Sequence, residues 1–121
     1  MAQEVKDNNQ YPFIPTLLIC GVNTPVCVQL LVNKPEFMLG KSDECDGVLS
    51  FNEEISREHC LILYKDGEYY IRDDKSTNGT YLNGALLEKG VAYPLVEGDR
   101  LRLSASSFTV EKLHNVPVRK N

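Results

Sequence analysis

Three short segments of the sequence combine hydroxyl, amide and positively charged side chains. They are Gly40-Lys41-Ser42, Ser56-Arg57-Glu58-His59 and Ser76-Thr77-Asn78-Gly79-Thr80. Such side chains donate hydrogen bonds, and the first two segments add positive charge, so together they could hold an anionic ligand. An Asn-Gly pair by itself is a strong signal for a tight turn, because both residues tolerate positive φ.

Each of these segments borders a run of residues typical of a β-strand. The clearest runs are HCLILYK and EYYIRD, which Asp66-Gly67 joins in the form expected of a two-residue hairpin. Apolar residues alternate with polar ones further along the chain, as at Leu101 and Leu103. No segment shows a sustained helical period.

The strand-like runs are short and closely spaced. Besides the hairpin, they cover 16–20, 26–32, 36–40, 47–51, 80–83, 85–87, 91–95, 100–103 and 106–113. About eleven short strands separated by turn residues predict an all-β fold, either an antiparallel sandwich or a barrel. Because the strands form the core of such a fold, functional residues are expected in loops at one end.

Length and composition favour one globular domain. The chain has 121 residues, of which 42% are apolar and 25% charged, and a net charge of −4. We expect a domain over 14–113, between a flexible leader at 1–13 and a flexible tail at 114–121. The charge lacks the broad positive surface of a duplex nucleic-acid binder, and no apolar run approaches the roughly 18 residues of a membrane span. The polar, acidic start has no secretion signal, which favours a cytoplasmic protein.

The four cysteines do not have the spacing of a zinc site. Cys20, Cys27, Cys45 and Cys60 include no C-x-x-C pair, and only two histidines are available. We expect Cys20, Cys27 and Cys60 to be reduced thiols that pack as small apolar groups, with a Cys20–Cys27 bridge as the alternative under oxidising conditions. The acidic loop SDECDGVLSFNE has carboxylates at some positions of a calcium loop, but its first ligand is wrong and no helices flank it. Neither a metal nor a cofactor is expected.

A serine and a histidine three residues apart also suggest a hydrolase. Ser56 would be the nucleophile, His59 the base, and Asp73 or Asp74 the group that orients the base. However, Ser56 does not lie in a G-x-S-x-G elbow, and the sequence offers no oxyanion site. We therefore expect a protein that is not an enzyme.

Taken in order, the motifs resemble those of the forkhead-associated (FHA) domain, a β-sandwich family that binds phosphothreonine in partner proteins. The family pattern is Gly-Arg in an early turn, followed by Ser-x-x-His, Asn-Gly-Thr and Asn-Gly. Here it reads Gly40-Lys41, Ser56-Arg57-Glu58-His59, Asn78-Gly79-Thr80 and Asn83-Gly84. Each motif alone is weak, but all four occur in order between residues 16 and 113, at suitable spacing and with no helix between them.

The resemblance implies a role for each matching residue. Ser56 would donate its hydroxyl proton to a phosphate oxygen, while Lys41 and Arg57 would supply positive charge. Thr77 would donate from its hydroxyl or backbone, and Asn78 would hold the main chain of the ligand. The residues expected to brace the recognition loops are Gly40, His59, Gly79, Thr80 and Asn83. The glycine of the first Asn-Gly pair would also let the backbone come close to the ligand.

One position departs from the family, because Lys41 stands where arginine is usual. Lysine keeps the charge but lacks the planar fork that makes two parallel bonds to phosphate, so weaker binding is expected, partly offset by Arg57. Four or five charge-assisted hydrogen bonds at about 1.5 to 3 kcal/mol each, less an association cost of at least about 4 kcal/mol, leave roughly micromolar affinity.

The sequence therefore predicts a module that docks threonine-phosphorylated proteins or peptides in kinase signalling. It is expected to be monomeric as an isolated domain, not to bind nucleic acid and not to insert directly into a membrane. Carboxylates beside the expected site favour neutral or basic residues next to the phosphothreonine; these are Glu44, Asp46, Glu53 and Glu54. The alternative is an FHA-fold scaffold that binds a partner through a sheet face, without phosphate.

Overall fold

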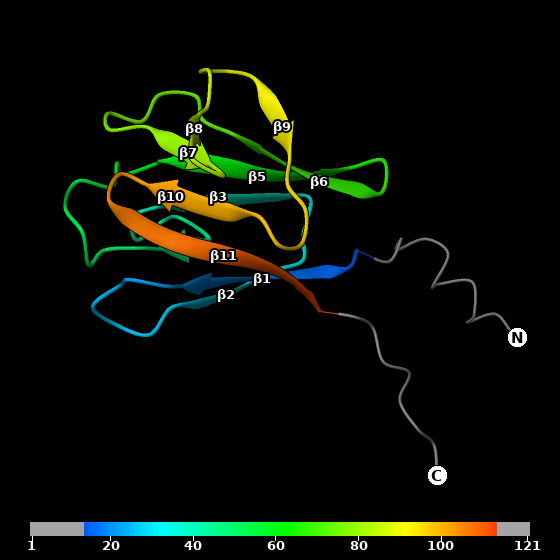
Figure 1. The fold of residues 1–121 in the computed structure, drawn as a ribbon, viewed down its shortest axis with the longest axis horizontal. Coiled ribbons are helices and arrows are strands. Elements are labelled where there is room, and N and C mark those ends of the chain that lie inside the picture. The colour runs from blue at the N-terminus through cyan, green and yellow to red at the C-terminus, as the bar shows by residue number, and fades with distance from the viewer. Residues whose placement is uncertain (1–13, 114–121) are drawn as a thin grey trace, which may run out of the picture.

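The computed structural model describes residues 14–113, which form eleven strands (Figure 1). The strands are β1 (Thr16–Gly21), β2 (Gln29–Val32), β3 (Glu36–Gly40), β4 (Gly47–Val48), β5 (Cys60–Lys65), β6 (Glu68–Arg72), β7 (Thr80–Leu82), β8 (Ala85–Leu86), β9 (Ala92–Pro94), β10 (Arg100–Leu103) and β11 (Ser106–Leu113). The predicted all-β architecture is confirmed, whereas the predicted leader and tail lie outside the described residues. Within 14–113, no helix is long and apolar enough to cross a membrane.

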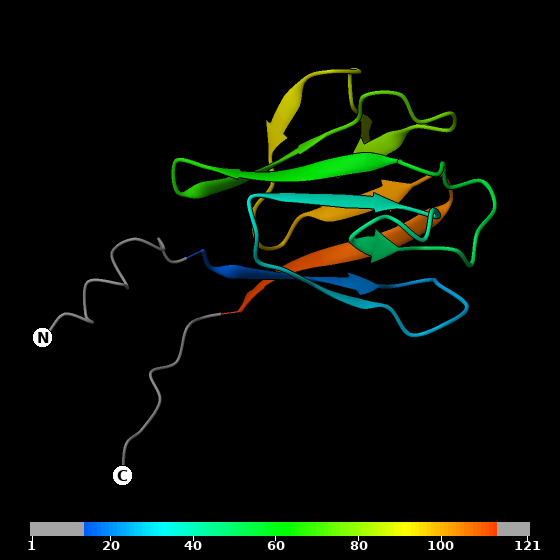
Figure 2. The same ribbon diagram turned by 180° about the vertical axis from the view of Figure 1, so that it is seen from behind.

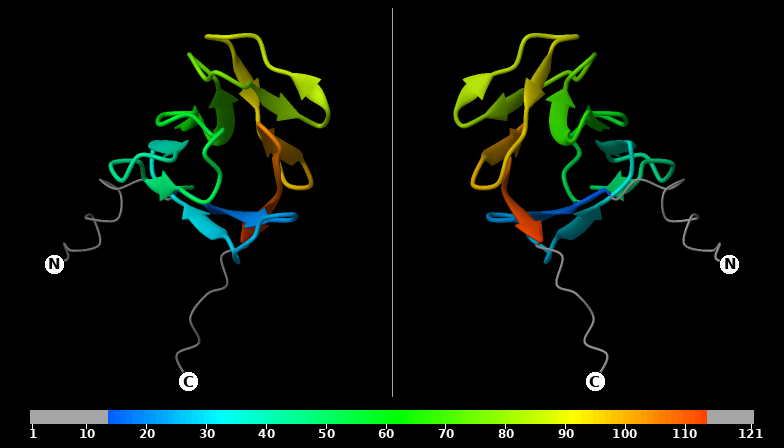
Figure 3. Two further views of the ribbon diagram at one scale, coloured as in Figure 1. Left: turned by 90° about the vertical axis from the view of Figure 1, so that its left-hand side faces the viewer. Right: turned by 90° about the vertical axis from the view of Figure 1, so that its right-hand side faces the viewer.

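The strands form two sheets that pack face to face (Figures 2 and 3). One sheet has the order β2-β1-β11-β10-β7-β8, and the other has the order β4-β3-β5-β6-β9. Neighbouring strands are antiparallel, except β3 and β4, which are parallel. The predicted sandwich is confirmed, with one parallel pair that the sequence did not predict.

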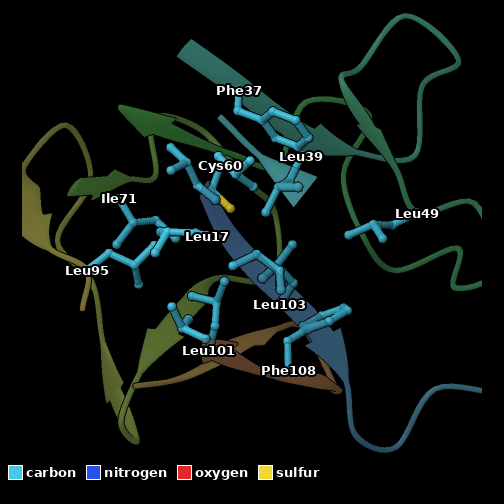
Figure 4. Close-up of a cluster of buried hydrophobic side chains, with 14 of the residues drawn as sticks. Leu17, Phe37, Leu39, Leu49, Cys60, Ile71, Leu95, Leu101, Leu103 and Phe108 are labelled. Atoms are coloured by element: carbon cyan, nitrogen blue, oxygen red, sulfur yellow. The ribbon is translucent and has the colours of Figure 1, made fainter. Parts of the chain in front are cut away.

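Alternate residues of facing strands build the core between the two sheets (Figure 4). Leu101 lies opposite Phe108 in the six-stranded sheet, and Ile62 lies opposite Ile71 in the five-stranded sheet. All four side chains are at most 1% exposed. Burying an apolar side chain of this size contributes about 1.5 to 3 kcal/mol. The core thus fixes the strand ends that carry the loops.

Two hairpins are closed by turns whose central residues have positive φ. Asp66 and Gly67, with φ of 54° and 86°, connect β5 to β6, and Asn83 and Gly84, with φ of 51° and 87°, connect β7 to β8. Positive φ at both central residues matches the right-handed twist of the flanking strands. Both predicted turns are confirmed.

Two predicted strands are much shorter in the structure. The run 47–51 is a strand only to Val48, and 26–32 is a strand only in its second half. Leu49 follows directly after the strand: its N–H still donates to the carbonyl of Gly40 at 2.7 Å, and its side chain, 1% exposed, joins the core. The apolar residues after Val48 are therefore core residues supplied by a loop.

All four cysteines are free thiols, and no disulfide joins Cys20 to Cys27. Cys45 and Cys60 are buried, Cys20 is half-buried and Cys27 is exposed. Burial raises the pKa of the Cys60 thiol far above its usual value, so this side chain packs as a neutral apolar group.

The loops that contain the predicted site residues extend from one end of the sandwich. This end is on the left of Figure 1, where β3 and β6 end and β5 begins. Because β3, β5 and β6 are neighbours in one sheet, their loops lie side by side. β1 begins and β11 ends at the opposite end of the sandwich.

Candidate functional site

A cavity of about 600 Å³ opens between three loops. The first loop follows β3, the second connects β4 to β5, and the third connects β6 to β7. The cavity is lined by Lys41, Ser42, Glu44, Glu53, Glu54, Ile55, Ser56, Arg57, Glu58, Lys75, Thr77 and Asn78. All five residues expected to bind the ligand are in this set, and none of the five expected bracing residues is.

Gly40 joins the first loop to the second. A Cβ atom at this position would lie 2.1 Å from the carbonyl oxygen of Arg57, a distance at which only glycine fits. The close approach lets the N–H of Lys41 donate to the carbonyl of Ser56 at 3.0 Å, and the N–H of Ser42 donates to the carbonyl of Arg57 at 3.2 Å. Two backbone hydrogen bonds therefore set Lys41 beside Ser56 and Arg57.

Ser56 joins the second loop to the third. Its Oγ accepts a hydrogen bond from the backbone N–H of Thr77 at 2.9 Å. A hydroxyl that accepts from an amide keeps its own proton available for donation. The half-buried Ser56 hydroxyl is thus held in place and can donate to a ligand in the cavity.

The side chains of Lys41 and Asn78 are both held by backbone carbonyls of two adjacent residues of the second loop, Glu53 and Glu54. Lys41 Nζ donates to the carbonyl of Glu53 at 3.0 Å, and Asn78 Nδ2 donates to the carbonyl of Glu54 at 2.9 Å. An ammonium group has three donors and a primary amide has two. Each group therefore keeps at least one donor for a ligand.

Two exposed cations complete the lining of the cavity. Arg57 makes no ion pair with any residue of the described part of the chain, and Lys75 Nζ lies 3.9 Å from the carboxylate of Glu58. The side chains of Lys75 and Glu58 are 76% and 54% exposed, and pairs of this kind add little stability. Both cations can turn toward an anion at little cost. Lys75, which directly precedes the third segment, was not among the predicted site residues.

His59 links the second and third loops from below the cavity. Its Nδ1 accepts from the backbone N–H of Ser56 at 3.0 Å, so Nε2 carries the proton and donates to the carbonyl of Gly79 at 2.9 Å. The imidazole is 1% exposed. Because Nδ1 is engaged by the amide of Ser56 rather than by its hydroxyl, the geometry is not that of a serine nucleophile and its base.

His59 makes the stability of the domain sensitive to pH. Burial lowers the pKa of the imidazole, and the hydrogen bond to Gly79 and the charge of Asp73 only partly oppose this effect. The unfolded chain, with a histidine pKa of about 6.5, then binds a proton that the folded chain binds only at lower pH. The contribution is fully present above the unfolded pKa of about 6.5 and is lost as the pH falls below it, through the lower pKa of the folded chain.

We therefore expect the free energy of unfolding of the wild type to decrease from about pH 7 to pH 5, and that of His59→Gln to change less over this range. Urea denaturation at several pH values measures both slopes. Equal slopes for the two proteins would contradict this role for His59.

Asp73, just after β6, anchors the third loop from inside. Its carboxylate, 0% exposed, accepts from the N–H and Oγ of Ser76 at 2.9 and 2.5 Å and from Oγ1 of Thr80 at 2.7 Å. Lys89 Nζ lies 3.4 Å from the same carboxylate and donates to the carbonyl of Ser76 at 2.8 Å. Burial raises the pKa of Asp73, but these hydrogen bonds and the charge of Lys89 outweigh it and lower the pKa below its usual value.

From the sequence, Asp73 was expected only as a possible orienting group of a hydrolase. A signal for its actual position was present, because an aspartate at a strand end with a serine three residues later is a common way to cap a turn. No comparable signal identified Lys89, which reaches the loop from a distant part of the chain. Thr80 belongs to the predicted bracing set, and the structure places its hydroxyl on this carboxylate.

Gly79 and Asn83 lie outside the cavity lining. Gly79 has φ of 89°, and a Cβ there would lie 2.9 Å from the side chain of Leu86, so its contacts are with the fold and not with the cavity. The side chain of Asn83 bonds to Asp99 and to the N–H of Arg100 at 2.9 Å each, which ties the β7–β8 turn to the turn before β10.

The acidic loop contributes only part of its carboxylates to the cavity. Asp46 lies outside it, where it pairs with Lys34 at 2.5 Å and accepts from the N–H of Met38 at 2.8 Å. Glu44, Glu53 and Glu54 line the cavity. Across residues 14–113, no group of three or more His, Cys, Asp or Glu side chains is placed to hold a metal ion.

The cavity therefore offers hydroxyl, amide and cationic donors that converge from three loops on a sandwich. The family model of the FHA domain matches residues 37–104, more than half of the chain and the whole of this site. The chain belongs to the FHA domain family. The match begins in β3 and ends just after β10. It therefore includes the Gly40-Lys41 turn and both Asn-Gly motifs, Asn78-Gly79 and Asn83-Gly84.

Relatives and solved structures agree with this assignment. The E3 ubiquitin-protein ligase CHFR of Xenopus tropicalis is 33% identical over 82 residues, which are 67% of this chain but 13% of that protein. The FHA domain of a hypothetical protein of Arabidopsis thaliana is 24% identical with a TM-score of 0.74, covering 88% of this chain and 92% of that one. The N-terminal FHA domain of Rad53p of Saccharomyces cerevisiae, in complex with a phosphothreonine peptide, is 23% identical with a TM-score of 0.71, covering 81% and 94%.

Proposed function

We propose that this FHA domain binds phosphothreonine in partner proteins through the cavity between its three loops. The observation that supports this most is the convergence of Lys41, Ser56 and Arg57 through the contact at Gly40. A phosphothreonine carries a charge of about −1.5 to −2 and three strong acceptor oxygens, so it requires several donors with positive charge in one place. The similarity to a domain in complex with a phosphothreonine peptide adds to the proposal.

Each donor has a proposed part in binding. The Ser56 hydroxyl, positioned by the amide of Thr77, donates to one phosphate oxygen. Lys41 and Arg57 supply charge and further hydrogen bonds, which are stronger than neutral ones because both partners are ionised. Thr77 donates from its hydroxyl to the phosphate, and Asn78 donates to the main chain beside the phosphothreonine.

We expect micromolar binding of a phosphothreonine peptide and no measurable binding of the unphosphorylated peptide. Ser56→Ala removes a donor to an ionised group, which corresponds to a loss of affinity of about tenfold to a hundredfold. Isothermal titration calorimetry with both peptides measures these differences. Arg57→Ala is expected to weaken binding as well, and Arg100→Ala, an exposed arginine outside the cavity, serves as its matched control.

Equal affinities for the phosphorylated and unphosphorylated peptides would contradict the proposal. A partner that binds through a sheet face would bind Ser56→Ala and Arg57→Ala as well as it binds the wild type. The same two variants therefore separate the two modes of binding.

The chain spans about 13% of the length of the CHFR relatives it matches. We propose that residues 14–113 act as a docking module that recruits a phosphorylated protein after a kinase has acted. The module itself would be monomeric and would catalyse no reaction, a view supported by the engagement of His59 Nδ1 with a backbone amide. Its free thiols suit the reducing cytoplasm, where we place its action.

A further inference from the structure

The cavity proposed to hold a dianion is lined by more acidic than basic residues. Its lining contains three cations and four carboxylates; the cations are Lys41, Arg57 and Lys75, and the carboxylates are Glu44, Glu53, Glu54 and Glu58. The whole chain, with a net charge of −4, does not compensate for this local excess. A ligand with phosphate as its only charge would meet a surrounding field that opposes it.

Most of these carboxylates are not neutralised by the protein. Glu58 is near Lys75, but Glu44, Glu53 and Glu54 form no ion pair within residues 14–113. The carboxylate of Glu54 accepts a hydrogen bond from the hydroxyl of Ser104 at 3.3 Å, which leaves its charge uncompensated. Three exposed negative charges are thus available to a ligand.

The acidic pair Glu53-Glu54 is held next to the phosphate donors by its own backbone. The carbonyls of the pair accept from Lys41 Nζ and Asn78 Nδ2, so both donors lie within a hydrogen bond of the pair. The segment is also fixed on each side, because the N–H of Glu54 donates to Asn52 Oδ1 at 2.9 Å and the side chain of Ile55 is 0% exposed. An extended ligand advances about 3.3 Å per residue, so residues near the phosphothreonine reach these carboxylates.

We propose that the phosphorylated segment bound by this site carries basic residues beside its phosphothreonine, and that Glu53 and Glu54 bind them. This inference rests on the proposed phosphothreonine site. Lysine or arginine near the phosphate would place positive charge beside the acidic pair while the phosphate contacts Lys41 and Arg57. The negative and the positive parts of the cavity would then each face a ligand group of opposite charge. Acidic neighbours would add repulsion at the same positions.

The test uses three phosphothreonine peptides that differ only at the positions beside the phosphothreonine. These positions carry lysine in the first peptide, alanine in the second and glutamate in the third. Exposed charge pairs contribute a factor of about 1.5 to 5 each, so we expect the lysine peptide to bind about tenfold more tightly than the glutamate peptide at low salt. The difference should shrink as salt is added, because exposed charges are screened. Calorimetry with the wild type measures these affinities.

Two double variants test the residues. Glu53→Gln with Glu54→Gln should remove most of the preference for lysine and leave the alanine peptide bound, while Glu97→Gln with Glu111→Gln, exposed carboxylates outside the cavity, should keep the preference. Equal affinity for lysine and glutamate peptides, or a preference that survives in the Glu53/Glu54 variant, would overturn the inference. Failure of the proposed function is distinct, since the phosphorylated alanine peptide would then bind no better than its unphosphorylated form.

Discussion

Replacement of Asp73 by alanine is expected to lower the free energy of unfolding by about 3 to 5 kcal/mol. The carboxylate is fully buried and accepts from Ser76, Thr80 and Lys89. Its removal leaves buried donors without an acceptor, and the loss of one member of such a network costs more than a single exposed hydrogen bond. Urea denaturation followed by circular dichroism measures the change.

Asp74 provides a matched control in the next position. Its side chain is 47% exposed and pairs with Arg72 at 2.8 Å on the surface. Asp74→Ala is expected to cost less than about 1 kcal/mol, because exposed pairs contribute little. If both alanine variants were equally stable, the interpretation of Asp73 as the anchor of the third loop would be wrong.

The same anchor has a consequence for ligand binding. Ser76 Oγ, held by Asp73, accepts from the N–H of Gly79 at 3.0 Å. Thr77 and Asn78 lie between these two points, so both ends of their segment are fixed from inside the protein. A loop that is already ordered loses less conformational entropy when a ligand binds. The buried network thus increases the affinity of the site for its ligand, although it does not itself contact the ligand.

The sequence predicted the fold well where local signals agree with one another. Alternation of apolar residues, as at Leu101 and Leu103, predicted strands, and Asp66-Gly67 predicted a hairpin; both are set by local geometry. The run after Val48 was misjudged because its apolar residues suited a strand equally well. Only tertiary structure places Leu49 in the core from a loop.

The site was partly predictable for a similar reason. Ser56 and Arg57 could be predicted because a hydroxyl and a basic side chain stand in a loop next to a clearly patterned strand, and loops at one end of a sandwich converge. Lys89 could not be predicted, because its contact with Asp73 depends on how two distant segments pack. The acidic pair Glu53-Glu54 was recognised as a source of repulsion, but its carbonyl contacts to Lys41 and Asn78 are visible only in three dimensions.

A frame of contacts between the three loops fixes the backbone positions from which the donor side chains extend. Gly40 brings the first two loops into contact, and Ser56 and His59 connect the second loop to the third. The charged ends of Arg57 and Lys75 project from this frame into solvent. Changes to exposed side chains should therefore alter affinity alone, whereas changes to the frame should alter stability and affinity together.

Gly40→Ala is the strongest test of this division, because the substitution adds one methyl group and removes no donor. The new Cβ would lie 2.1 Å from the carbonyl oxygen and 2.7 Å from the carbonyl carbon of Arg57, and a backbone neighbour cannot rotate away. The loops must separate, which breaks the bonds from Lys41 and Ser42 to the second loop. We expect a loss of about 3 kcal/mol in the free energy of unfolding.

We also expect Gly40→Ala to weaken phosphothreonine peptide binding at least about tenfold, since a displacement of one ångström at a binding group has effects of this size. Gly67→Ala is the matched control: it lies in the β5–β6 turn, has φ of 86° and would place its Cβ with no atom within 4 Å. It should cost about 1 kcal/mol from backbone strain and leave peptide affinity unchanged. A Gly40→Ala protein as stable as Gly67→Ala, with wild-type affinity, would mean that the contact at Gly40 does not hold the site together.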